Sequence, residues 1–165
     1  MSSSDPRGPA PAGVSVALAT VMTTIGFFAL AVFGLGALSI TTDADIISVP
    51  GTGQAPGIVG MIIAIAVFAG ILWSVVRSAH PRFLSVWIIA IVTALGHLLA
   101  VGATAIIVTS DYVASLAVMA GLITGGGSLI VLAAAAVAGW AGIALRRTRA
   151  SRPRWPWEDD EPDAR

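Results

Sequence analysis

The chain contains no cysteine, and it contains no lysine, so all nine of its basic residues are arginine. Without cysteine, this sequence has no disulfide framework, no thiolate metal site and no catalytic thiol. The nine basic residues are balanced by nine acidic ones, which gives a formal net charge of zero. The sequence therefore gives no indication of binding to nucleic acid through bulk charge.

Charge is scarce: charged residues make up 11% of the chain, against about 25% in a typical soluble domain. The charges gather at the two ends and in short connectors. Between them lie uncharged runs long enough to cross a hydrocarbon layer of about 30 Å, which takes about 20 helical residues. The composition therefore predicts one multi-span membrane domain in which lipid replaces water as the solvent.

We predict an all-α bundle of four transmembrane helices, with spans at about residues 14–38, 58–76, 83–108 and 113–145. The flanking residues 1–13 and 146–165 are rich in Pro, Ser or charge and are predicted to be disordered. The first span is longer than the ~7–15 apolar residues of a signal peptide. Since Ala37-Leu38-Ser39 resembles a cleavage site, removal of this span stays as the alternative.

The connectors contain recognisable helix-ending and helix-starting signals. Residues 40–57 combine Asp43 and Asp45 with several prolines and glycines, which indicates an irregular loop. Two carboxylates form a poor cation site, so we interpret this segment as a solvated loop. Further along, Ser110 or Asp111 is suited to cap the next helix by accepting bonds from its first N–H groups.

The last apolar run, residues 113–145, is longer than one bilayer crossing and is interrupted by Gly125, Gly126 and Gly127. One interpretation is a single long helix that is kinked at the glycines. The other is a short outer helix, a glycine hinge and a span that begins near Ser128. The sequence does not decide between a moving hinge and a static kink.

The distribution of arginine predicts the orientation, because basic residues are retained on the cytoplasmic side. With four spans, the N-terminus, the middle connector and the C-terminal tail share one side, and they hold all nine arginines: Arg7, Arg77, Arg82, Arg146, Arg147, Arg149, Arg152, Arg154 and Arg165. The opposite side holds only acidic charges: Asp43, Asp45 and Asp111. We therefore expect a plasma-membrane protein with both termini in the cytoplasm.

His97 is the one ionisable side chain inside a long apolar run. An ionisable residue at membrane depth is a candidate functional site by default. Thr93 and Thr104, together with Gly96 and Ala100, share its helix face, and this stripe of small and polar residues predicts contact with protein. We expect the contact to be with the first span, where Thr23 and Thr24 lie at comparable depth. The stripe can be a transport pathway, or it can fix helix packing through a neutral, hydrogen-bonded histidine, and we favour the second interpretation.

Arg146, Arg147 and Arg149 follow the last span directly and are candidates for contact with anionic lipid headgroups. The same cluster can act simply as a topology signal. In the tail, Trp155-Pro156-Trp157 before an acidic run is either a docking peptide or a segment without a role. We predict no cofactor and no metal site.

The sequence contains no Ser-His-Asp set, no HExxH motif and no carboxylate pair at membrane depth, so we expect no enzymatic activity. Two functions remain. The first is a non-catalytic structural, accessory or regulatory subunit that packs against itself or another membrane protein. The second is a protomer of a small oligomeric transporter or channel that uses His97 and the neighbouring threonines. In size, composition and layout the chain resembles the small four-span membrane proteins of high-GC Gram-positive bacteria, a resemblance that assigns a role to no residue.

Overall fold

The computed structural model describes residues 14–43, 53–78 and 83–147. The described residues form five helices and no strand: α1 Val16–Thr42, α2 Ala55–Val76, α3 Ser85–Thr109, α4 Tyr112–Thr124 and α5 Gly127–Arg147. Four of them, α1, α2, α3 and α5, are long and apolar enough to cross a membrane. The predicted all-α, four-span architecture is confirmed.

Short polar residues fix several of the helix ends. The Ser15 hydroxyl accepts a bond from the Leu18 N–H at the start of α1, and the Asp111 carboxylate accepts one from the Val113 N–H at the start of α4. The capping role predicted for Asp111 is thus confirmed. Asp43 and Ser110 end α1 and α3 in the left-handed conformation, with φ of 48° and 54°. The N–H of Ser110 donates to the carbonyl oxygen of Ile106, and this bond and those to Ser15 and Asp111 satisfy backbone groups that lipid cannot satisfy.

The predicted loop at residues 40–57 is too long at both ends. α1 continues to Thr42, and α2 already begins at Ala55. Pro56 lies in the first turn of α2, where proline is tolerated because the N–H that it lacks would have no partner in the helix. The Pro and Gly residues were therefore an imprecise marker of where the helices end. Asp45 lies outside the described residues.

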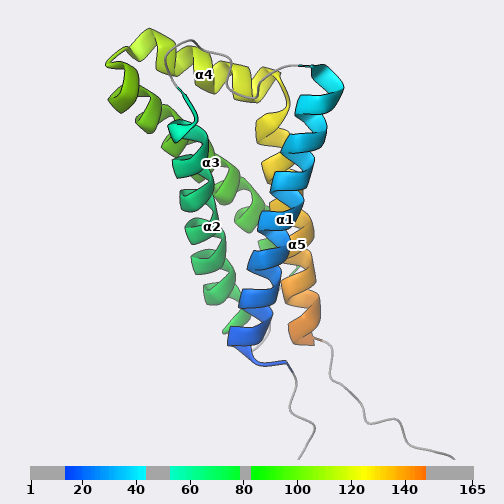
Figure 1. Cartoon of the computed structure of the whole chain (residues 1–165). Helices are drawn as coiled ribbons and strands as arrows, with labels where there is room; N and C mark the ends of the chain where they lie inside the picture. Colours follow the sequence, from blue (N-terminus) through cyan, green and yellow to red (C-terminus); the bar gives the residue numbers. More distant parts are fainter. Residues whose placement is uncertain (1–13, 44–52, 79–82, 148–165) are drawn as a thin grey trace, which may run out of the picture.

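The last apolar run forms two helices, α4 and α5, so it is not one long kinked span. Figure 1 shows α4 lying across one end of the bundle, between the end of α3 and the start of α5. Gly126 makes the corner with φ of 86°, a conformation that residues with a Cβ atom rarely adopt. The structure therefore shows the second of the two arrangements considered for this run: a short helix, a glycine junction and a separate span.

The four spans pack in the cyclic order α1, α2, α3, α5, in which each contacts the next, and α5 also contacts α1. Across one diagonal, α1 and α3 have no Cα atoms within 8 Å of each other. The main core joins all four spans and includes the stacked rings of Phe27 on α1 and Phe68 on α2, whose centroids are 4.7 Å apart. A smaller cluster joins α3 to α4: Val101, Ala105, Val118 and Leu122.

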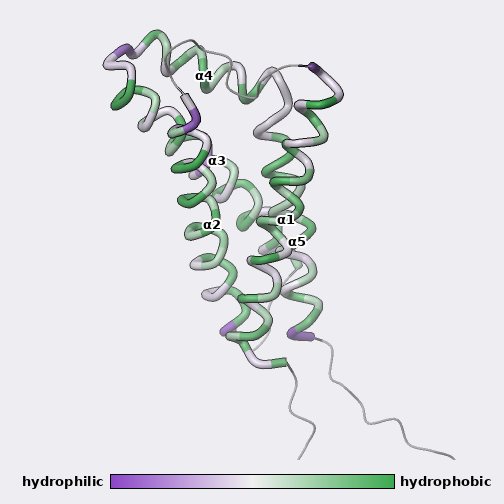
Figure 2. The backbone as a smooth tube through the Cα atoms, in the orientation of Figure 1, coloured by the Kyte–Doolittle hydropathy of each residue, from purple (hydrophilic) through white to green (hydrophobic). Residues whose placement is uncertain are grey.

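Glycines on α5 allow the other three spans to approach it closely. A Cβ atom at Gly139 would contact Ile89 of α3, and one at Gly142 would contact both Leu72 of α2 and Thr23 of α1. Small residues have this role in membrane bundles because association depends on close packing and not on a hydrophobic driving force. Figure 2 shows that most of the hydrophilic positions lie near the helix ends and that the spans between them are largely apolar.

Candidate functional site

The buried polar stripe on α3 packs against α2, and the predicted contact with the first span is not formed. A Cβ atom at Gly60 of α2 would lie 3.3 Å from both Cδ2 and Nε2 of His97, and one at Gly96 would lie 3.3 Å from Val67 of α2. His97 itself is only 3% exposed. The absence of a side chain at Gly60 therefore creates the space in which the imidazole ring packs.

The structure separates the five predicted members of the intramembrane polar site into two groups. Thr93, His97 and Thr104 are on α3, whereas Thr23 and Thr24 are on α1, which has no Cα atom within 8 Å of a Cα atom of α3. The hydroxyl of Thr23 donates to the carbonyl oxygen of Ala19 at 2.7 Å, and that of Thr104 donates to Ala100 at 2.8 Å. A threonine that bonds to its own helix needs no partner on another helix, which is why Thr23 is satisfied without His97.

Two polar atoms in the α3 stripe have no hydrogen-bond partner within the described part of the chain. They are Oγ1 of Thr93, which is fully buried, and Nδ1 of His97. Unsatisfied polar groups are costly at membrane depth, where no bulk water can replace a missing partner. Thr93 and His97 are therefore the pair on α3 whose buried polar atoms lack a partner, and among the other described residues the buried Oγ1 of Thr24 on α1 lacks one as well. A sequence pattern cannot identify unpartnered atoms, so the distinction between Thr93 and Thr104 was not predictable.

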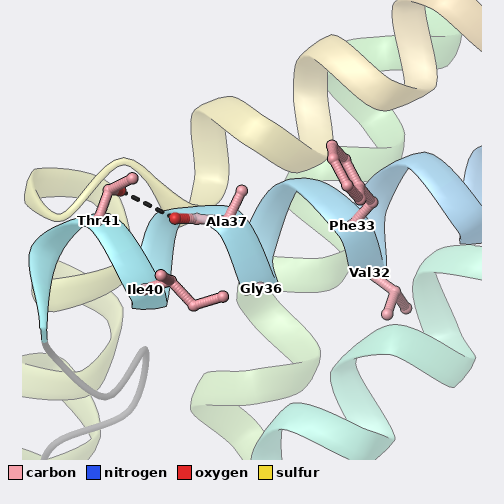
Figure 3. A pocket seen from close by; sticks show the side chains of 6 residues that line it. All are labelled: Val32, Phe33, Gly36, Ala37, Ile40 and Thr41. Carbon is pink, nitrogen blue, oxygen red and sulfur yellow. Dashed lines mark hydrogen bonds between the residues drawn. The ribbon is translucent and has the colours of Figure 1, made fainter.

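A second candidate site is a groove of about 450 Å³ on the exposed face of α1. Figure 3 shows its lining, which comes entirely from this helix: Val32, Phe33, Gly36, Ala37, Ile40 and Thr41. Gly36 has nothing within 4 Å of the position where a Cβ atom would lie, whereas Phe33 and Ile40 project at either end with exposed fractions of 76% and 83%. Thr41 donates to the carbonyl oxygen of Ala37, so its hydroxyl is satisfied within α1. This apolar groove was not recognised in the sequence.

A third feature is the arginine pair that ends α5. Nη1 of Arg146 donates to the carbonyl oxygen of Val14 at 2.7 Å, and Nε donates to that of Val76 at 3.3 Å. The guanidinium of Arg147 lies over the ring of Phe83, 4.7 Å from its centroid. Arg146 therefore has protein partners where lipid contact was predicted, whereas Arg147 is exposed. Arg149 and the Trp155-Pro156-Trp157 segment lie outside the described residues.

The glycine triplet forms the corner between α4 and α5. A Cβ atom at Gly125 would lie 2.7 Å from the carbonyl oxygen of Gly121, and one at Gly127 would lie 3.0 Å from Leu122. Each glycine thus has a structural reason to lack a side chain, and hinge motion stays a prediction. Among the described residues, no group of three His, Cys, Asp or Glu side chains is placed to hold a metal ion.

Comparison with known proteins matches residues 14–165 to the model of a family of unknown function, DUF6121. No curated protein and no solved structure matches the chain. The matched region covers all the described helices, so the groove on α1, the stripe on α3 and the arginine pair on α5 all lie within it.

Proposed function

The chain belongs to the DUF6121 family of unknown function, and we propose that it acts as a non-catalytic membrane subunit, structural, accessory or regulatory, that associates with another membrane protein. The observation that carries this proposal is the groove on α1. Its lining is apolar apart from one internally bonded hydroxyl, so it offers close packing and no chemistry.

The groove suits an apolar transmembrane helix as its occupant. Small residues on an exposed helix face let a second backbone approach closely, which is the main source of stability when helices associate in lipid. Gly36 and Ala37 form the floor, and Phe33 and Ile40 flank it with large side chains that can pack against the incoming helix. The groove lies along one helix, so its axis can align with that of a neighbouring span.

Affinity purification in mild detergent, followed by mass spectrometry, tests this proposal. Gly36→Leu places a large side chain in the groove, and its Cβ atom would have nothing within 4 Å. Gly70→Leu is the matched control, because Gly70 is an exposed glycine of α2 that also has nothing within 4 Å of its Cβ position. We expect a specific membrane protein to co-purify with the wild type and with Gly70→Leu, and to be lost with Gly36→Leu. Identical co-purifying partners for both variants would contradict the proposal. A homo-oligomer that dissociates in Gly36→Leu would identify a second copy of the chain as the occupant of the groove.

We also propose that the protein lies in the plasma membrane with both termini in the cytoplasm. The distribution of charge in the fold supports this orientation. Arg77, Arg146 and Arg147 lie at the bundle end where α2 and α5 finish, and Asp43 and Asp111 lie at the opposite end. Arg77 and Arg147 are both exposed at that end, where their positive charges can attract anionic lipid.

A second candidate function, a protomer of an oligomeric transporter or channel, is favoured by one observation: the unpartnered polar atoms of Thr93 and His97. A transport pathway needs polar groups that a solute can use. Proteoliposome flux measurements with the wild type and His97→Phe test this function. A solute flux that requires the His97 imidazole would support it, and equal flux in both proteins would contradict it.

A further inference from the structure

Thr93 differs from most threonines in the described helices because its hydroxyl group does not bond to its own helix. The common arrangement is donation to the carbonyl oxygen four residues earlier, which is shown by Thr20, Thr23, Thr41, Thr42, Thr104, Thr109 and Thr124. Thr93 is fully buried, yet its Oγ1 makes no such bond. The hydroxyl oxygens of Thr24 and Ser128 are also buried without a partner among the described residues, but other parts of both residues are exposed, whereas the whole of Thr93 is buried. The Thr93 hydroxyl is therefore available to a partner that is not its own helix backbone.

His97 lies one helical turn after Thr93, so the two side chains share a face of α3. The Cδ2–Nε2 edge of its ring faces Gly60 of α2, and the unpartnered Nδ1 is on the opposite edge. Side chains four residues apart have Cβ atoms about 5–6 Å from each other. One small molecule that makes two hydrogen bonds of about 2.8 Å can join polar atoms of side chains that neighbour each other in this way.

We propose that Thr93 and His97 form a binding site for a small neutral hydrogen-bonding ligand inside the membrane domain, and that water is its simplest occupant. The ligand is expected to be neutral because every described charged side chain lies at a helix end and none lies near this site. These side chains are Asp43, Arg77, Asp111, Arg146 and Arg147. An ionic ligand would have no counter-charge at this depth and would be expelled. A hydroxyl both donates and accepts, and a neutral imidazole nitrogen does one or the other, so the pair can satisfy a ligand that does both.

Water-edited solid-state NMR on the full chain in lipid vesicles, labelled with ¹⁵N-histidine, tests this site with water as the probe. The chain has two histidines, and His97→Gln assigns their signals. We expect magnetisation transfer from water protons to the His97 ring in the wild type and its loss in Thr93→Val. The site is refuted if the wild-type His97 ring receives no transfer or if Thr93→Val leaves the transfer unchanged.

Two further variants keep the test independent of folding. Thr93→Ser retains the hydroxyl and is expected to retain the transfer. Thr104→Val removes a hydroxyl that bonds to the carbonyl oxygen of Ala100 and is expected to leave the His97 signal unchanged. Thermal unfolding gives a second readout: Thr93→Val lowers the unfolding temperature if the hydroxyl holds a ligand, whereas an unchanged or raised temperature shows an unused hydroxyl and refutes the site.

Discussion

The guanidinium of Arg146 donates a hydrogen bond of 2.7 Å from Nη1 to the carbonyl oxygen of Val14, and so joins the end of the last helix to the start of the first. The same side chain donates from Nε to Val76, the last residue of α2. A carbonyl group at a helix C-terminus lacks an intrahelical partner and carries partial negative charge, which makes an arginine a suitable donor. One residue thus connects the ends of three spans.

We predict that Arg146→Ala destabilises the bundle by about 1–3 kcal/mol, because hydrogen bonds to a charged group contribute about 1.5–3 kcal/mol each and this group is only partly buried. Unfolding followed by circular dichroism in detergent measures the change. Arg147→Ala is the matched control, and it should cost about 0.5–1 kcal/mol, since it removes an exposed cation–π contact with Phe83. Equal losses of stability in the two variants would indicate that the hydrogen bonds of Arg146 to Val14 and Val76 stabilise the bundle no more than the contact of Arg147 with Phe83 does.

Gly60 is predicted to be the most sensitive glycine at the contact between α2 and α3. A Cβ atom there would overlap Val101 and press against the His97 ring, so Gly60→Ala should cost about 1–3 kcal/mol through overpacking. Gly70→Ala on the exposed face of the same helix should be neutral or slightly stabilising. Unfolding in detergent compares them, and the prediction fails if both substitutions have the same effect.

Ser115 is predicted to hold α4 against α3. Its hydroxyl donates to the carbonyl oxygen of Gly102 at 2.8 Å from a buried position. Ser115→Ala should cost about 0.6–1.5 kcal/mol, in the range found for hydrogen bonds between membrane helices, and should speed amide exchange in α4. Hydrogen exchange with mass spectrometry locates the effect. Exchange that is unchanged in α4, or accelerated equally in α1, would show that this bond does not secure α4.

The orientation can be tested directly because the chain lacks cysteine, so that a single introduced thiol is unique. Ser78 and Ser110 are both exposed and lie at opposite ends of the bundle. With cytoplasmic termini, a membrane-impermeant maleimide added to intact cells should label Ser110→Cys and should label Ser78→Cys only after permeabilisation. The reverse pattern would place the termini outside.

Much of the fold follows from the sequence because lipid imposes a simple requirement. Every backbone polar group in the hydrocarbon layer must be satisfied within its own helix, so a long uncharged run forms a helix. The spans at 58–76 and 83–108 accordingly lie within a few residues of α2 and α3. Asp111 was predictable as a cap because a carboxylate directly before an apolar run can accept from the free N–H groups of the first turn.

What the sequence could not decide is which helix faces pack together. In a soluble helix the apolar face is the buried one, but here both faces are apolar, so hydropathy does not separate the face toward lipid from the face toward protein. The partner of His97 depends instead on Gly60, which provides the space for its ring on α2 and not on α1. The glycine triplet indicated a break, but only its conformation, with Gly126 at φ of 86°, makes it a corner between α4 and α5.

The sequence by itself therefore determined that this protein is a four-span helical membrane domain, because the length of the uncharged runs and the cost of unsatisfied backbone in lipid leave little choice. Only the tertiary structure decided that α4 lies across the bundle and that Arg146 joins three helix ends. It also decided that the hydroxyl of Thr93 and Nδ1 of His97 are buried without partners among the described residues. These features depend on how side chains that are distant in the sequence fit together in space. That fit depends on the shapes of the packed side chains, which the local pattern of apolar residues does not reveal.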